Sequence, residues 1–228
     1  MTDSNTDSES TSHPSDCFID WTCILMRDRY ILIKRLDYGS YASVWITYDI
    51  IDKLYYAIKI HNRESYDIGK RETYIYEKIK KYKSPYIMTQ IRHFDYNDIN
   101  SKEKYYCSIM PLMSSSLHKI STKKKLDIDS VKKYIIQILT GLKLLHDNDI
   151  IHGDIKPENF LCDTGKKINF DIEQIIKYRK NKSKMNKLVN LHDEENNEEY
   201  NNIKIVKLTD MGECILPSDK TRKDEVQT

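Results

Sequence analysis

The hydrophobic pattern changes halfway along the chain, and this change constrains the fold more than any other feature of the 228 residues. The first half holds short runs rich in Ile, Val, Tyr and Trp, divided by polar breaks, which is typical of antiparallel strands. The second half opens with apolar residues at the spacing of a long helix. We therefore expect a sheet-forming first half and a second half that begins with a helix.

The first half predicts five strands and one helix. Strands are expected at residues 30–36, 44–48, 54–60, 87–94 and 105–110. The helix is expected at residues 70–83, where Tyr74, Ile75 and Ile79 recur at helical spacing within a charged stretch. The predicted order is three strands, one helix and two further strands.

The second half predicts one long helix, a polar loop and a further strand. Apolar side chains from Val131 to Leu145 fall on one helical stripe, and either Asp127 or Asp129 is placed to cap its start. The pattern fades near His146, and a polar loop with apolar flanks follows at residues 150–159. A strand at residues 203–208 then ends in Thr209-Asp210-Met211-Gly212.

Two segments are too polar to contribute much to a core. Residues 1–16 are almost entirely Ser, Thr, Asp, Asn and Glu, and we expect them to form a disordered tail. Residues 162–202 carry a basic run at 177–187 and an acidic run at 193–199. A stretch this long with few apolar residues usually marks an insertion or a disordered segment, and a solvated, disordered insertion is the expectation here.

Composition excludes several classes of protein. The net charge is only +2, so bulk electrostatics favours neither nucleic acid nor a membrane surface as a partner. No run approaches the roughly 18 apolar residues of a membrane span, and the N-terminus has acids where a signal peptide carries lysines. The five cysteines are scattered without a C-x-x-C pair, which fits reduced thiols. We expect a soluble protein inside the cell, cytoplasmic or nuclear.

Three separated motifs carry the chemistry. Lys59 ends the strand-like run Tyr56-Ala57-Ile58-Lys59, a polar loop reads His152-Gly153-Asp154-Ile155-Lys156-Pro157-Glu158-Asn159, and Asp210-Met211-Gly212 follows a strand. Taken singly, each has an ordinary structural explanation: a solvated edge lysine, a capping aspartate and a turn. Their common order, each in the strand or loop context that its role requires, favours one shared site.

The chain resembles the eukaryotic protein kinase family from about Tyr30 to its last residue. The resemblance rests on the loop from Leu36 to Val44 in place of a Gly-rich loop, on Ala57-Ile58-Lys59, on the helix residue Glu72, and on the two later motifs. The details are most similar to the serine/arginine-rich protein kinases. These details are Tyr-Gly-Ser-Tyr-Ala-Ser-Val-Trp after the first strand, Asp-Ile-Lys-Pro-Glu-Asn, a non-aromatic residue within D-x-G, and a spacer in the second half.

The resemblance implies an α+β, bilobal protein-kinase-like fold at residues 30–228. An N-lobe at about 30–111 would hold the antiparallel sheet and one helix. A partial, helical C-lobe would occupy about 112–228, interrupted by the polar insertion at 162–202. The C-lobe is expected to be incomplete, because the sequence given ends sixteen residues after Gly212, within the activation segment, before any A-P-E motif.

The resemblance also implies a site for ATP and Mg²⁺. The residues expected to bind ATP are Leu36, Asp37, Tyr38, Gly39, Ser40, Tyr41, Ala42, Ser43, Val44, Ala57, Lys59, Glu72, Met110, Pro111 and Met113. Among them, Leu36, Val44 and Ala57 would form the adenine walls, Met110 would be the gatekeeper, and Pro111 and Met113 would face the adenine edge through their backbones. Lys59 would contact the α and β phosphates while paired with Glu72.

The remaining implied roles concern the phosphoryl-transfer step. Asp154 would orient the substrate hydroxyl and accept its proton, and Lys156 would neutralise the transferring phosphate. Asn159 and Asp210 would ligate Mg²⁺, which prefers oxygen ligands. The implied activity is ATP-dependent phosphorylation of serine or threonine on a protein, and the subfamily resemblance extends this to substrates rich in Arg-Ser dipeptides.

Several departures from the family pattern keep alternatives open. Asp37 replaces the first glycine of the loop, and a carboxylate there would repel triphosphate unless it points outward. Gly153 replaces the usual arginine, so pairing with a phosphorylated activation loop is not available. His-Gly-Asp also occurs in small-molecule kinases of the aminoglycoside phosphotransferase type, although these lack a lysine two residues later.

The alternative function is a truncated, catalytically inactive kinase-like module that binds nucleotide or a partner. Retention of Lys59, Glu72, Asp154, Asn159 and Asp210 favours an active enzyme, whereas the expected loss of C-lobe helices favours the module. A separate chain that supplies the missing C-lobe is a further expected partner.

Overall fold

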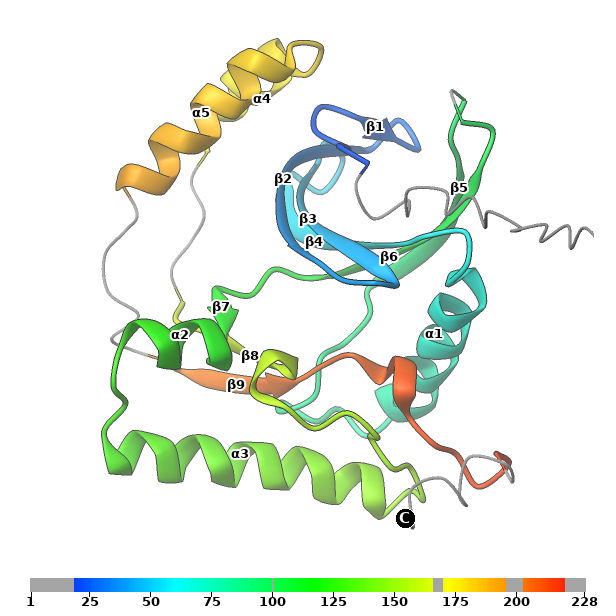
Figure 1. Ribbon diagram of the computed structural model, residues 1–228, viewed down its shortest axis with the longest axis vertical. Helices are drawn as coiled ribbons and strands as arrows, with labels where there is room; N and C mark the ends of the chain where they lie inside the picture. The colour runs from blue at the N-terminus through cyan, green and yellow to red at the C-terminus, as the bar shows by residue number, and fades with distance from the viewer. Residues whose placement is uncertain (1–18, 100, 166–169, 196–202, 220–228) are drawn as a thin grey trace, which may run out of the picture.

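The computed structural model describes residues 19–99, 101–165, 170–195 and 203–219. These residues form two layers, a twisted antiparallel sheet and a mostly helical part below it (Figure 1). The predicted tail at residues 1–16 lies outside the described residues. Within them, no helix is both long enough and apolar enough to span a membrane.

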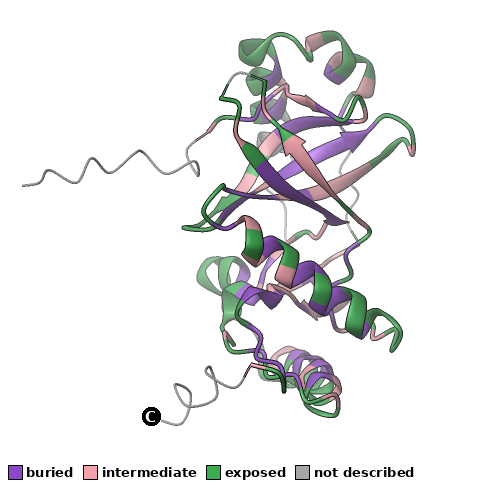
Figure 2. Ribbon diagram, turned by 90° about the vertical axis from the view of Figure 1, so that its right-hand side faces the viewer, coloured by how far each residue is buried: buried purple, intermediate pink, exposed green. Residues whose placement is uncertain are grey.

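The upper layer is a six-stranded antiparallel sheet with the order β1-β2-β3-β4-β6-β5. Its strands are β1 (Leu25–Met26), β2 (Tyr30–Tyr38), β3 (Ala42–Asp49), β4 (Leu54–His61), β5 (Arg92–Asn97) and β6 (Lys104–Pro111). Four of these strands cover the runs predicted at 30–36, 44–48, 54–60 and 105–110. β-Branched and aromatic residues alternate between the two faces of these strands, so each face packs against its own cluster of side chains. Buried residues accordingly recur along the strands of the sheet (Figure 2).

Helix α1 (Tyr66–Lys80) crosses below the sheet and begins four residues before the predicted start at residue 70. It also ends before the predicted residue 83, because Lys83 adopts a left-handed backbone conformation with φ of 47°. Gly69 lets the helix approach the sheet closely, since a Cβ at this position would meet the rings of His61 and Tyr106. This close approach sets the distance at which α1 packs against β4 and β6.

The strand predicted at residues 87–94 is wrong over most of its length, because β5 begins only at Arg92. Ile87 forms a single parallel bridge with Leu208, and the Met88 N–H donates to the Leu208 carbonyl at 2.8 Å. Ile87 and Met88 are both buried in the lower core. Their apolar side chains therefore join the two layers and do not extend the sheet.

The lower layer is built on the long helix predicted from Val131 to Leu145. Helix α3 (Ile128–His146) begins at Asp127, whose carboxylate accepts from the Ser130 N–H at 2.8 Å, so Asp127 is the cap and Asp129 is not. Helix α2 (Leu117–Lys123) and a small sheet of β7 (Ser115–Ser116), β8 (Phe160–Asp163) and β9 (Ile205–Leu208) lie above α3 (Figure 1).

The segment predicted to be a solvated, disordered insertion contains two helices. Within residues 162–202, α4 (Ile172–Tyr178) and α5 (Lys182–Glu195) pack as a pair beside the upper sheet (Figure 1). Phe170, Ile175, Met185 and Val189 are buried in one cluster with side chains of β2 and β3. The Tyr55 hydroxyl donates to the Phe170 carbonyl at 3.1 Å. A few apolar residues at helical spacing are therefore enough to pack this polar segment against the sheet.

Removing a buried side chain from α4 should show how much this docking stabilises the protein. Ile175 is fully buried, so Ile175→Ala should lower the free energy of unfolding by about 2–5 kcal/mol. The neighbour Ile176 is 43% exposed, and Ile176→Ala should cost less than about 1 kcal/mol. Urea denaturation of both variants measures the difference. Equal effects would mean that α4 does not pack on the sheet in solution.

The described cysteines fit the predicted reduced thiols. Cys23, Cys107, Cys162 and Cys214 are all free, and the last three are buried. Burial raises the pKa of the Cys162 and Cys214 thiols to about 12, so both remain protonated at neutral pH. Cys17 lies outside the described residues.

Candidate active site

The first part of the candidate site is a buried ion pair between the sheet and α1. Lys59 lies on β4, where it pairs with Val44 of β3 and Ser108 of β6. Its Nζ contacts Oε2 of Glu72 from α1 at 2.8 Å, and the Glu72 side chain is fully buried. The predicted pair is therefore formed, because the close packing of α1 brings its carboxylate under the strand.

Asp210 completes this part from the opposite side. It follows β9 in a left-handed backbone conformation with φ of 66°, and its Oδ1 lies 2.9 Å from Lys59 Nζ. The next residue, Met211, donates its N–H to Glu72 Oε1 at 3.3 Å. Residues far apart in the sequence thus meet around one ammonium group. The strained backbone at Asp210, uncommon for a residue other than glycine, is held by these contacts.

The charges of this group stabilise one another despite burial. Burial alone would raise the pKa of Glu72, but Lys59 and His61 outweigh it and lower the pKa to about 2. Burial alone would lower the pKa of Lys59, but the carboxylates of Glu72 and Asp210 outweigh it and raise the pKa. Lys59 and Glu72 are therefore both charged at neutral pH, so the Lys59 ammonium is held as a cation against the Glu72 carboxylate.

His61 belongs to the same group, although the sequence motifs did not single it out. Its Nε2 lies 3.2 Å from Glu72 Oε2, and its side chain is 1% exposed. Burial lowers the pKa of His61, so the ring is neutral at pH 7. The signal that could have revealed it is strand alternation, since His61 is two residues after Lys59 and shares its face of β4.

The second part of the candidate site is the loop that precedes β8. His152 contacts the Thr209 carbonyl through Nε2 at 2.9 Å, which ties the loop to the segment that carries Asp210. Gly153 has φ of 82°, and a Cβ there would collide with the Glu213 carbonyl oxygen. Local packing therefore requires glycine at this position, where the family usually has arginine.

Three polar side chains gather within this loop. Asp154 Oδ2 lies 2.7 Å from Lys156 Nζ, and Asn159 Nδ2 donates to the same oxygen at 2.9 Å. Burial would raise the pKa of Asp154, but the bonds from Lys156 and Asn159 outweigh it and lower the pKa. Asp154 is thus an anion at neutral pH, held in place and still partly open to solvent.

The predicted adenine walls come together through the register of the sheet. Ala57 pairs with Met110, and Tyr56 pairs with Pro111 at the end of β6. Met110 is buried, while Ala57 and Met113 are partly buried against the same core. Leu36 is partly buried against a second cluster, which contains Ile46, the residue that pairs with Ala57 across β3 and β4. These residues stay candidates for the nucleotide walls, because Ala57 lies on β4 two residues before Lys59 and Met110 is its partner on the neighbouring strand.

The loop at residues 37–43 comprises the end of β2, the connection at residues 39–41 and the start of β3. The Gly39 N–H donates to the Ala42 carbonyl at 2.9 Å, which closes the turn. Asn62 donates through Nδ2 to the Ser40 carbonyl at 3.1 Å, and Tyr41 is largely exposed. The Asp37 carboxylate points toward α2, where Lys119 Nζ lies 3.7 Å away. The loop is therefore anchored although it keeps only one glycine.

The donor set suits magnesium bound together with a nucleotide. Asp210 offers a carboxylate that is 42% exposed, and Asn159 uses its amide nitrogen toward Asp154, so its amide oxygen is the atom left to act as a ligand. Among the residues that the structure describes, no group of three or more His, Cys, Asp or Glu side chains could hold a metal by itself. Two protein oxygens fit an ion whose other ligands are phosphate and water.

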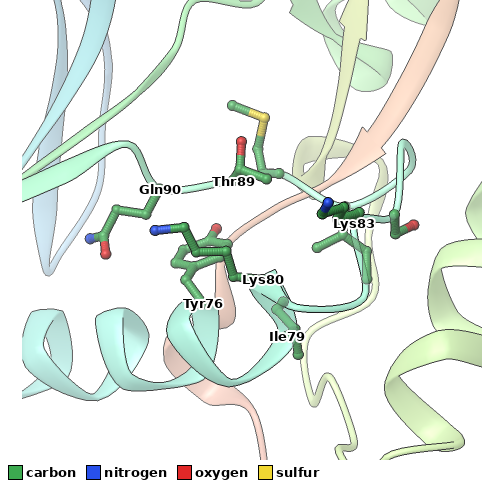
Figure 3. Close-up of a pocket in the computed structure, with 9 residues that line it drawn as sticks. Tyr76, Ile79, Lys80, Lys83, Thr89 and Gln90 are labelled. Carbon is green, nitrogen blue, oxygen red and sulfur yellow. The ribbon is translucent and has the colours of Figure 1, made fainter.

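A shallow groove lies elsewhere and contains none of the predicted site residues. Figure 3 shows it between the C-terminal half of α1 and the segment that leads to β5. Apolar side chains such as Tyr76 and Ile79 line it together with Lys80 and Lys83. The convergence of the Lys59 and Asp154 groups, and not this groove, marks the candidate active site.

Comparison with known families agrees with this geometry. Residues 30–225 match the protein kinase domain family. The chain belongs to the protein kinase family. The α+β, kinase-like fold predicted from the sequence is thereby confirmed, whereas membership of the serine/arginine-rich subfamily stays a prediction.

Named kinases resemble this chain over about three fifths of its length. It is 36% identical over 145 residues, 60% of this chain, to L205 of Acanthamoeba polyphaga mimivirus, which is named as a serine/threonine-protein kinase. It is 29% identical over 144 residues, 61% of this chain, to hormonally up-regulated neu tumor-associated kinase homolog A of Xenopus laevis. These matches cover 27% and 20% of the two kinases, so the chain spans less than a third of either.

A solved kinase domain shares the fold. The crystal structure of the PF14_0431 kinase domain superposes with a TM-score of 0.63 at 22% sequence identity. The match covers 89% of this chain and 56% of that domain. At this level of identity the likeness concerns the fold alone.

Proposed function

We propose that this chain carries the nucleotide site and catalytic loop of an ATP-dependent protein kinase that phosphorylates serine or threonine. The observation that carries the proposal is the contact of Lys59 Nζ with both Glu72 and Asp210, at 2.8 and 2.9 Å. Phosphoryl transfer requires phosphates that are held and neutralised more than it requires covalent chemistry by the protein. A lysine fixed by two carboxylates beside a partly open aspartate supplies this environment.

In this proposal Lys59 holds the phosphates and Glu72 holds Lys59. Asn159 and Asp210 hold Mg²⁺, which when bound neutralises phosphate charge and orients the transferring group. Leu36, Val44, Ala57 and Met110 surround the adenine, while Pro111 and Met113 present backbone groups to its edge. Pro111 has no N–H, so only its carbonyl oxygen can take part.

Asp154 and Lys156 act on the protein substrate. Asp154 accepts the proton from the substrate hydroxyl, because its lowered pKa keeps it ionised at neutral pH. Lys156, only 2.7 Å from Asp154 in the structure, moves its charge toward the phosphate that is being transferred. The lysine two residues after the aspartate supports a protein kinase over the aminoglycoside phosphotransferase alternative.

For the substrate class we propose serines in Arg-Ser repeats. The support is the sequence resemblance to serine/arginine-rich protein kinases around Gly39 and in Asp154 to Asn159. A direct test compares three peptides with labelled ATP and Mg²⁺: an Arg-Ser repeat, the same repeat with Lys for Arg, and an Arg-Ala repeat. We expect labelling of the first to exceed that of the second by at least about tenfold, and no labelling of the third. Equal labelling of the first two would contradict the substrate class while leaving kinase activity intact.

We also propose a division into an N-lobe at about 30–111 and a C-lobe from about 112, with further helices covering α3. Apolar side chains of α3 face away from the described core: Ile128, Ile135 and Leu139 are 66%, 48% and 58% exposed. Ile151 and Ile155 in the adjoining loop are also exposed. Ile128, Ile135 and Leu139 share one stripe of α3 by their spacing, and apolar side chains exposed together usually mark an interface. Helices that complete a kinase C-lobe, from this or another chain, are the proposed occupant.

This proposal predicts the behaviour of the 228-residue chain by itself. Its uncovered α3 face should make it self-associate at micromolar concentration, and the double variant Ile135→Glu, Leu139→Glu should remain monomeric with an unchanged melting temperature. Sedimentation velocity measures both. A wild-type chain that is monomeric at all concentrations would contradict the exposed interface. Nucleotide binding without transfer in that chain would favour the inactive-module alternative.

A further inference from the structure

The loop above the candidate site carries a negative charge where an anionic ligand would approach. Asp37 is 66% exposed at its side chain and begins the loop at residues 37–43. Its Oδ1 accepts from the following N–H of Tyr38 at 2.9 Å, which holds the carboxylate at the start of the turn. Such a charge opposes a nucleotide triphosphate unless another group offsets it.

The offsetting group comes from the lower layer. Lys119 lies on α2, a helix anchored by the fully buried Ile120 and capped by Ser116. Lys119 Nζ lies 3.7 Å from Asp37 Oδ2 and donates to the Leu36 carbonyl at 3.2 Å. The lysine therefore contacts both the charge and the backbone at the start of the loop, and it links α2 of the lower layer to the end of β2 in the upper layer.

The opposite flank of the loop has its own anchor. Asn62, at the end of β4, is 5% exposed and donates to the Ser40 carbonyl, while its N–H donates to the Tyr41 carbonyl at 3.2 Å. Its Oδ1 accepts from the Ser65 N–H at 2.8 Å, which fixes the amide. The loop is thus held by the upper layer on one side and by Lys119 on the other.

We propose that Lys119 is a nucleotide-positioning residue that ties this loop to the lower layer and cancels the charge of Asp37. The inference rests on the proposed binding of ATP at Lys59 and deepens it. It explains how a carboxylate can replace glycine in a loop next to phosphate. Because the side chains of Lys119 and Asp37 are 50% and 66% exposed, each contact is modest, and the effects on affinity should depend on ionic strength.

The charges predict effects of opposite sign on nucleotide affinity. Lys119→Met leaves Asp37 uncompensated and should raise the ATP dissociation constant by about two- to fivefold. Asp37→Asn leaves Lys119 uncompensated and should lower the constant by about the same factor. The double variant should return close to the wild-type value, and each single effect should shrink in high salt.

Hydrogen exchange tests the loop contact without any nucleotide. Amides of residues 38–42 should exchange about two- to fivefold faster in Lys119→Met than in the wild type. The swapped pair Asp37→Lys, Lys119→Asp should restore slow exchange, because it restores the attraction. Lys125→Met, at an exposed lysine just beyond α2, serves as the control and should change nothing.

Titration of each variant with a fluorescent ATP analogue and Mg²⁺ gives the second readout. Faster loop exchange in Lys119→Met together with opposite shifts in affinity supports the proposal. Unchanged loop exchange in Lys119→Met, or shifts of the same sign in the two single variants, overturns it. A wild type that binds no nucleotide at all refutes the proposed function, while loop exchange still decides whether Lys119 holds Asp37.

Discussion

Asp154→Asn should abolish phosphate transfer while leaving nucleotide binding intact. The amide keeps the size of the carboxylate and can still accept the bond from Asn159, but it cannot take a proton from a hydroxyl. Loss of a positioned general base lowers the rate by on the order of 10²–10⁴-fold. Initial rates of transfer of labelled phosphate to a peptide give the effect on kcat. The assay uses this chain together with the C-lobe helices proposed to cover α3.

Nucleotide titration separates this outcome from misfolding. The dissociation constant of Asp154→Asn for ATP should stay within about threefold of wild type, because Lys59 and not Asp154 is proposed to hold the phosphates. Asp147→Asn, at an exposed ion pair with Lys143 at the end of α3, is the matched control and should retain full activity. Full transfer activity in Asp154→Asn would remove Asp154 from the proposed catalytic role.

Glu72→Gln should destabilise the protein strongly and make its stability less sensitive to acid. Glu72 is fully buried, accepts hydrogen bonds from Lys59 and the Met211 N–H, and lies 3.2 Å from His61 Nε2, so its loss leaves Lys59 buried with only Asp210. Its pKa in the folded protein is about 2, below the ordinary value near 4.5. A shift of this size corresponds to about 3 kcal/mol of stability.

The direction of the Glu72 pKa shift sets the pH range over which this carboxylate stabilises the fold. Because the folded pKa lies below the unfolded one, this stability is present above about pH 4.5 and is lost as the pH falls toward 2. Urea denaturation at pH 7 should therefore separate Glu72→Gln from wild type by about 3 kcal/mol, and the gap should close in acid. Glu77→Gln, on the exposed face of the same helix, should cost less than about 1 kcal/mol at any pH. A gap that is constant from pH 7 to pH 3 would contradict a charged, stabilising Glu72.

The Lys59 and Asp154 groups could be predicted from sequence because their chemistry depends on local order. Lys59 ends an apolar strand, Asp154 lies in a polar loop with apolar flanks, and Asp210 follows a strand, so each has a context that a single sequence displays. The resemblance supplied their joint role, and the structure brings Lys59 to Glu72 and Asp210. The alternation of β4 also places His61 on the same face as Lys59. A histidine on a strand can have several roles, however, and its role here depends on the contact with Glu72 of α1, which the sequence does not show.

The remaining features depend on contacts between distant segments, which local patterns do not encode. The helices α4 and α5 are polar on most of their surface, and only docking on β2 and β3 reveals that Ile175 and Met185 belong to a core. Ile87 has the pattern of a strand but joins Leu208 in the lower layer. Lys119 is one lysine among many in the sequence, and its role follows only from the position of α2 beneath Asp37.

Equilibrium dialysis of labelled ATP, with and without Mg²⁺, tests the central claim most directly. The account predicts one ATP bound per chain, tighter binding when Mg²⁺ is present, loss of this metal dependence in Asp210→Asn, and weakening by at least about tenfold in Lys59→Met. The unaffected control is Asp147→Asn. Absence of ATP binding, or binding that ignores Mg²⁺ and survives Lys59→Met unchanged, would contradict a phosphotransfer site at Lys59 and Asp210.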